Sequence, residues 1–136
     1  MTFANRGKAA EAAVKKYLKS IDAVDTIHYR YPDFRAGFKS PAPCDFMVLR
    51  HGQLTLLEVK SVEHAYRLPH KNMSPDQVAR MRMWACAGAE SWVLVQFTTG
   101  WRAESVEHFL VRDGGSWDMS PIEPRPLVAV MKEILC

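Results

Sequence analysis

The chain lacks the features that would place it in several whole classes of protein. None of its apolar runs approaches the roughly 20 residues that a membrane-spanning helix needs, so a membrane protein is not expected. No apolar stretch follows the charged opening that contains Arg6 and Lys8, which argues against a secretory signal. The sequence also contains no internal repeat, low-complexity tract or long linker. Residues 1–136 are therefore expected to form one domain.

Cysteine is scarce, and its spacing excludes two further classes. Cys44, Cys86 and Cys136 are odd in number, far apart and form no Cys-x-x-Cys motif. Neither a disulfide framework nor a zinc site is expected, and the reducing cytoplasm is the expected compartment.

The charge balance has no strong excess of either sign. The net charge is +3, with 48% hydrophobic and 24% charged residues, as in an ordinary globular protein. This weakly basic balance is compatible with a nucleic-acid partner but does not by itself indicate one.

Hydrophobic periodicity predicts an α/β domain with a mixed sheet. Apolar residues recur at helical spacing from Ala10 to Ile21, which predicts a helix over about residues 5–20. Prolines and a glycine predict a loop over 32–43. Strands are expected over residues 26–31, 44–50, 53–60 and 91–97, with a further candidate at 107–111.

Two more helices have clear sequence signals. Ser74 is a good N-cap, Pro75 fits the first turn, and Gln77 follows the cap by three residues. The helix that starts there is expected to end before Gly88, and a last helix is expected from about Pro126.

The two central strands are expected to form a tight hairpin. Only His51-Gly52 separates them, and a two-residue connection with glycine second fits a type I′ turn. In that register the numbers of facing residues sum to 103, so Asp45 faces Glu58 (45 + 58 = 103). Directly opposed like charges destabilise a sheet. A divalent cation with hard oxygen ligands would remove the conflict.

Lys60 completes a set of residues that can hydrolyse a phosphodiester. It follows Glu58 by two residues, so strand alternation points both side chains to one face. Two carboxylates can hold magnesium, and a lysine can orient water or stabilise the charge of the transition state. In the alternative interpretation, Asp45 caps a loop and the other two are surface charges.

The residues around this set carry a family resemblance. Pro43-Cys44-Asp45 and Glu58-Val59-Lys60 resemble the PD-(D/E)xK signature of the restriction-endonuclease-like superfamily, with Cys44 inserted between Pro and Asp. Residues 5–97 are similar to the archaeal Holliday-junction resolvases and the RecU-type bacterial resolvases, through segments 5–11, 57–61, 74–83 and 92–97.

The resemblance implies a restriction-endonuclease-like fold, in which helices flank a central mixed β-sheet. It also implies a magnesium-dependent endonuclease of DNA recombination and repair, in which manganese can substitute, acting as a homodimer on four-way or other branched DNA. Asp45 and Glu58 would bind the metal with the backbone carbonyl of Val59, Lys60 would be catalytic, and Glu11 would be a further acidic site residue. The stretch from Tyr31 to Asp45 is shorter than the stalk of RecU-type enzymes.

Several secondary candidates keep an ordinary explanation beside the functional one. Glu11 could simply pair with Lys15 on the helix surface, Gln77 could serve the capping box, and Tyr66 could pack or stack on an exposed base. Cations near an acidic centre would offset its repulsion of a phosphate backbone, although loop charges are often only solvated. The DNA-binding candidates are Arg6, Lys8, Lys15, Ser61, Arg67, Lys71 and Gln77.

Three functions remain open from the sequence. The first is a structure-selective endonuclease, and the second is a nuclease for linear, flap or single-stranded DNA. The third is a non-catalytic DNA-binding subunit, against which the intact Asp45, Glu58 and Lys60 argue. An apolar dimer interface could be formed by Trp84, Trp101 and the final helix, and packing in the core explains these residues equally well.

Overall fold

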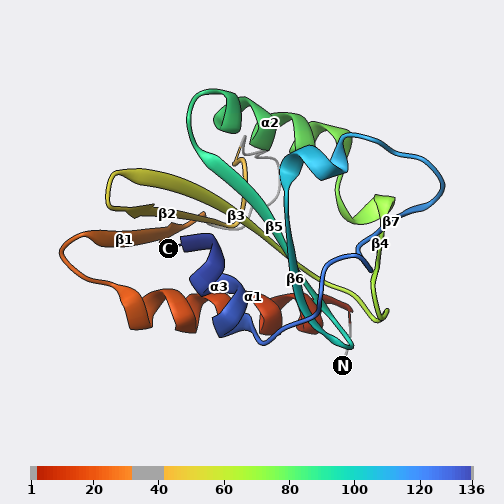
Figure 1. The fold of residues 1–136 in the computed structure, drawn as a ribbon, viewed down its shortest axis with the longest axis horizontal. Helices are drawn as coiled ribbons and strands as arrows, with labels where there is room; N and C mark the ends of the chain where they lie inside the picture. The colour runs from red at the N-terminus through yellow and green to blue at the C-terminus, as the bar shows by residue number, and fades with distance from the viewer. Residues whose placement is uncertain (1–2, 32–41, 136) are drawn as a thin grey trace.

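A five-stranded mixed sheet forms the centre of the molecule (Figure 1). The computed structural model describes residues 3–31 and 42–135, so most of the loop expected over 32–43 lies outside the described residues. The strand order is β1 (Thr26–Arg30), β2 (Phe46–Arg50), β3 (Gln53–Ser61), β5 (Glu90–Phe97) and β6 (Gly100–Ser105). β3 and β5 are parallel and the other neighbours antiparallel. The predicted fold class is confirmed.

Helices cover both faces of the sheet (Figure 1). α1 (Phe3–Ile21) and α3 (Leu127–Leu135) pack on one face, and α2 (Pro75–Cys86) packs on the other. Alternation along β5 explains how one strand serves two cores, because Leu94 joins the first and Val93 and Val95 join the second. No helix of the described ranges has both the length and the hydrophobicity to cross a membrane.

The first core depends on the predicted apolar stripe of α1. Ala10, Val14 and Leu18 are completely buried and pack with Phe46 and Leu57 of the sheet. The second core joins α2 to the smaller elements at one end of the sheet. These are β4 (Arg67–Pro69), η1 (His70–Asn72), η2 (Val106–Phe109) and β7 (Ser116–Asp118).

The strand expected over 107–111 is wrong. Residues 106–109 form the 3₁₀ turn η2, which Ser105 begins by accepting a hydrogen bond from the Glu107 N–H at 3.4 Å. Val106 and Phe109 are both buried, and their three-residue spacing suits a 3₁₀ turn rather than strand alternation. The strand in this region is β6, whose mixed sequence had no clear period.

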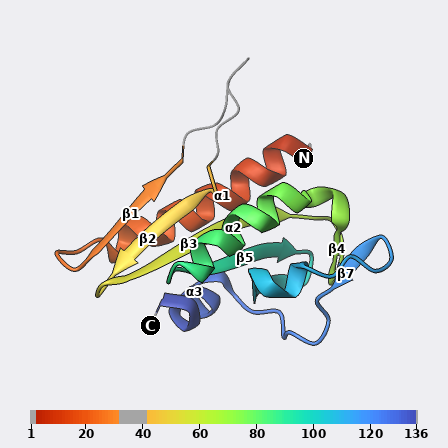
Figure 2. The same ribbon diagram turned by 90° about the horizontal axis from the view of Figure 1, so that it is seen from above.

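The predicted hairpin turn is confirmed. His51 and Gly52 have φ values of +49° and +79°, as a type I′ turn requires. Arg50 pairs with Gln53 and Val48 with Thr55, which is the predicted register next to the turn. In Figure 2, α2 lies over β3 and β5, whereas β1 and β2 extend beyond it.

Two glycine substitutions should change stability in opposite directions. Gly52→Ala should lower the free energy of unfolding by about 1 kcal/mol or more, because the residue has positive φ. Gly7→Ala should raise it by about 0.5–1 kcal/mol, because Gly7 lies in α1 and an added Cβ would meet no atom within 4 Å. Urea unfolding measures both, and equal signs for the two variants would contradict the assigned conformations.

Candidate active site

Two of the predicted catalytic residues, Glu58 and Lys60, lie on β3 in the middle of the sheet. Glu58 and Lys60 pair in register with Val93 and Val95 of β5, which face α2. Glu58 is only 4% exposed, because strands cover both sides of β3. A charged group in so dry a position needs a compensating partner.

Asp45 lies where β2 begins, and its predicted pairing needs a correction. Ladder pairing stops at Phe46 and Leu57, and the Asp45 N–H donates to the Leu57 carbonyl at 3.2 Å. Asp45 is therefore not directly opposite Glu58. The chain bends at Asp45, and its Oδ2 accepts a hydrogen bond from the Val59 N–H at 2.9 Å. The bend gives a half-buried carboxylate a backbone donor that a regular strand would not offer.

The two carboxylates nevertheless interact strongly. Burial, followed by the negative charge of Glu58, raises the pKa of Asp45 to about 8. The Val59 N–H and the Lys60 ammonium oppose this rise, and Glu11 adds to it. Glu58 and Glu11 are thus each close enough to repel Asp45, as the hairpin prediction expected for Glu58.

Glu58 has one occupied and one unoccupied carboxylate oxygen. Its Oε2 accepts the Lys60 ammonium at 2.9 Å in a largely buried ion pair. Its Oε1 is buried and has no hydrogen-bond partner among the residues that the structure describes. A buried acceptor without a donor is costly, and a ligand that binds this oxygen would remove that cost.

Cys44, the residue inserted in the motif, is not a candidate nucleophile. Its thiol donates to the Phe46 carbonyl at 3.1 Å. Burial and the charge of Glu58 raise the pKa of Cys44 to about 12, so the thiolate is not available at neutral pH.

Glu11 and Arg30 extend the site onto α1 and β1. The Glu11 Oε2 accepts Arg30 Nη2 at 2.8 Å, and both side chains are about three-quarters buried. The ordinary interpretation of Glu11 expected an ion pair with Lys15, and the structure gives it one with Arg30. The position of Arg30 follows from its pairing with Phe46, the residue next to Asp45. The sequence offered no sign of this ion pair, because nothing in it showed that β1 is the second neighbour of β2.

The predicted DNA-binding residues have mixed surroundings. Arg6 pairs with Glu63 at 3.3 Å, and the buried Ser61 donates to Gln96 Oε1 at 3.3 Å. The Ser74 hydroxyl accepts the Gln77 N–H at 3.1 Å, which confirms the cap. A role of Gln77 in binding DNA stays a prediction. The exposed candidates are Lys8, Lys15, Arg67 and Lys71.

The donor set fits a hard divalent cation. In residues 3–31 and 42–135, no group of three or more His, Cys, Asp or Glu side chains is placed to hold a metal. Asp45 and Glu58 supply two carboxylates, and Glu58 Oε1 lacks a partner. Magnesium usually binds through one or two carboxylates and keeps several waters. The Val59 carbonyl stays a predicted ligand.

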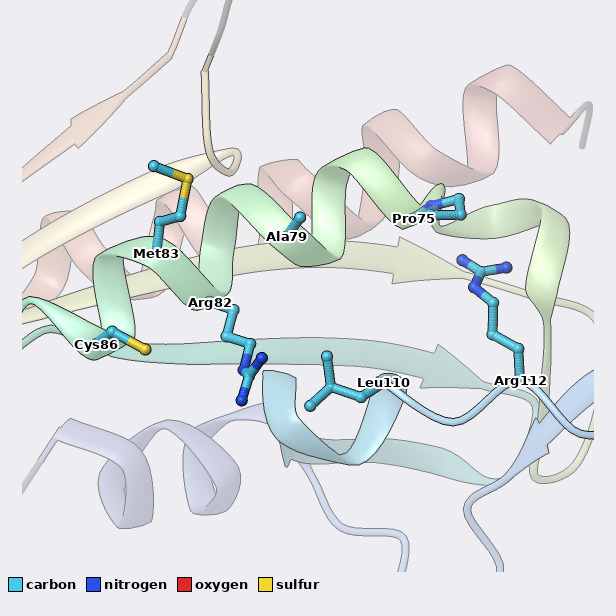
Figure 3. Close-up of a pocket in the computed structure, with 7 residues that line it drawn as sticks. All are labelled: Pro75, Ala79, Arg82, Met83, Cys86, Leu110 and Arg112. Carbon is cyan, nitrogen blue, oxygen red and sulfur yellow. The ribbon is translucent and has the colours of Figure 1, made fainter.

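A cavity of about 600 Å³ lies away from these carboxylates, on the outer side of α2 (Figure 3). It is lined by Pro75, Ala79, Arg82, Met83, Cys86, Leu110 and Arg112. None of the catalytic candidates contributes to it.

Asp45→Asn should stabilise the metal-free protein in a pH-dependent way. Between pH 4 and 8 the unfolded state ionises Asp45 while the folded state keeps the proton, so wild-type stability falls as the pH rises. The variant should therefore match the wild type near pH 4. At pH 7.5 the free energy of unfolding of the variant should exceed that of the wild type by at least about 1 kcal/mol, which corresponds to a shift of roughly one pKa unit.

In the same pH series of urea unfolding, Asp118→Asn is the control, because its expected change in stability has the opposite sign. A hydrogen bond from Ser120 lowers the pKa of Asp118, so Asp118→Asn should lose stability at neutral pH and not at low pH. A pH-independent effect of Asp45→Asn would contradict the electrostatic assignment.

Comparison with known proteins supports the fold and not a closer identity. No family model matches the chain, and no curated protein matches it. Among solved structures, the chain is similar to Archaeoglobus fulgidus Hjc, a Holliday junction resolvase from an archaeal hyperthermophile. The TM-score is 0.61 at 22% identity, over 84% of this chain and 89% of that one. The chain therefore has the fold of an archaeal resolvase.

Proposed function

We propose that the protein is a magnesium-dependent endodeoxyribonuclease with Asp45, Glu58 and Lys60 at its active site. The observation that carries the proposal is the close pair of carboxylates, of which the buried Glu58 Oε1 has no hydrogen-bond partner within residues 3–31 and 42–135. A structural role gives no reason to bury two mutually repelling acids in the middle of a sheet. A cation-binding role gives one.

Each side chain has a distinct part in the proposed reaction. Magnesium bound by Asp45 and Glu58 would polarise the phosphate and acidify a bound water. The Val59 N–H orients the Asp45 carboxylate. Lys60, held beside Glu58, places an ammonium where it can stabilise the charge that develops on the phosphate. Arg30 holds Glu11 at the border of the site.

Branched DNA is the proposed substrate. The similarity in fold to a Holliday junction resolvase supports it, as do the exposed Lys8 and Lys15 on the helix that carries Glu11. A nuclease for linear, flap or single-stranded DNA is the second candidate, since the same carboxylates would serve it. A purely DNA-binding subunit is disfavoured, because binding alone does not need the buried acidic pair.

Glu58→Gln should lower cleavage of a four-way junction by at least about a hundredfold while the protein stays folded. The amide keeps the shape of the side chain and removes the charge that binds the cation. Cleavage should require magnesium or manganese and stop in excess chelator, and calcium should support binding with little turnover. Gel assays of labelled junctions measure both effects.

The matched control is Glu63→Gln. Glu63 is an exposed acid that follows β3 and pairs with Arg6, so its loss should change cleavage little. Full activity of Glu58→Gln, or of the wild type in chelator, would refute the proposed site.

We also propose a homodimer, with the cavity on α2 as its contact. Met83 lines this cavity and is 70% exposed, and Leu110 on the same wall is also exposed. Trp84 is exposed nearby, whereas Trp101 is only 7% exposed and belongs to the first core with most of α3. A two-fold contact would insert Met83 of each copy at the cavity of the other and supply the paired active sites that symmetric cleavage needs.

Met83→Glu should convert the dimer to a monomer and lower paired cleavage of a junction by about tenfold or more. Sedimentation velocity measures the mass. Ile27→Glu is the control, because Ile27 is 61% exposed on β1, on a different apolar surface. A wild-type monomer that cuts a junction and its linear arms equally well would shift the assignment to the general nuclease.

A further inference from the structure

The loop that follows β3 and the first residue of β4 carry an aromatic and cationic cluster whose tyrosine belongs to neither hydrophobic core. The cluster consists of His64, Tyr66 and Arg67. We propose that Tyr66 and Arg67 form a stacking platform for an unpaired nucleobase next to the active site. This inference rests on the proposed function and specifies its substrate as DNA with a base exposed from the helix.

The backbone of the loop is held from several sides. His64 Nδ1 accepts the N–H groups of Tyr66 and Arg67 at 3.1 and 2.9 Å. The Tyr66 carbonyl accepts the Met119 N–H at 2.9 Å, and the buried Arg102 donates to the Ala65 carbonyl. The segment is therefore ordered before any ligand arrives, which lowers the entropic cost of binding.

The Tyr66 side chain is only partly buried and belongs to neither hydrophobic core. His64 meets its ring edge-on at a centroid distance of 5.1 Å, and the Arg67 guanidinium lies 5.5 Å from the ring centroid. Asp118 pairs with Arg67 at 3.8 Å and steadies it. Within the described part of the chain the Tyr66 hydroxyl has no hydrogen bond, although tyrosine hydroxyls that are buried usually have one. Aromatic rings and guanidinium planes are the groups on which exposed bases stack.

The platform is continuous with the proposed active site. β3 carries Glu58 and Lys60 and leads directly into the loop, and six residues span at most about 20 Å. Glu63 of the same loop pairs with Arg6 of α1, the helix that carries Glu11. A base on Tyr66 would therefore belong to the strand that the carboxylates engage. A perfectly paired duplex keeps its base faces stacked, so only a branch, bulge, flap or single strand can use the platform.

The test is equilibrium binding in calcium, with two short duplexes that differ by one bulged 2-aminopurine. The wild type should bind the bulged DNA more tightly and quench its fluorescence. Tyr66→Ala should weaken that binding by about 5- to 100-fold, remove the quenching and leave the affinity for the perfect duplex unchanged. Tyr66→Phe should behave as the wild type, because it keeps the ring.

Tyr29→Ala is the matched control, since Tyr29 is exposed on β1, away from the loop. Equal losses on both duplexes for Tyr66→Ala, or a Tyr66→Phe variant as weak as Tyr66→Ala, would overturn the platform. Wild-type selectivity for the bulge without any metal-dependent cleavage would overturn the nuclease and retain the platform. A wild type that binds neither duplex would overturn both.

Discussion

The close approach of two acids, Glu58 buried in the middle of the sheet and Asp45 half-buried where β2 begins, is the constraint on which the rest of the structure depends. Burial and the charge of Glu58 raise the pKa of Asp45, and the fold offsets that rise only in part. The Val59 N–H serves Asp45 and the Lys60 ammonium serves Glu58, while Glu58 Oε1 is left without a donor. The arrangement leaves one buried carboxylate oxygen for which the described residues supply no donor, and this oxygen is the basis of the proposed cation site.

The surrounding elements hold this pair in place from both faces. α1 packs its apolar stripe under the sheet and brings Glu11 to the border of the site, where Arg30 binds it. The parallel pairing of β3 with β5 makes β3 a central strand and removes water from Glu58. The loop after β3 is ordered by hydrogen bonds to its backbone. The proposed catalytic residues and the proposed stacking platform thus both depend on the position of β3.

Local signals in the sequence predicted the elements and the core of the site. The stripe of α1, the cap at Ser74 and the turn at His51-Gly52 all have local physical causes, and each is confirmed. The spacing of Glu58 and Lys60 was enough to place both on one face of a strand, where they form an ion pair. The strand expected over 107–111 was wrong, because the 3₁₀ turn η2 follows from a cap at Ser105 that a short apolar run does not reveal.

The sequence by itself determined the helices and the hairpin turn, because these depend on contacts a few residues apart. The turn then sets the register of its two strands, which brings Asp45 near Glu58 and Lys60. Only the tertiary structure decided that Asp45 leaves the ladder for the Val59 N–H, that Arg30 binds Glu11, and that Trp101 is in the core while Met83 is exposed. Those outcomes depend on which strands are neighbours and which helix covers which face. Such long-range pairings are set by the packing of the whole chain and leave no local periodicity to read.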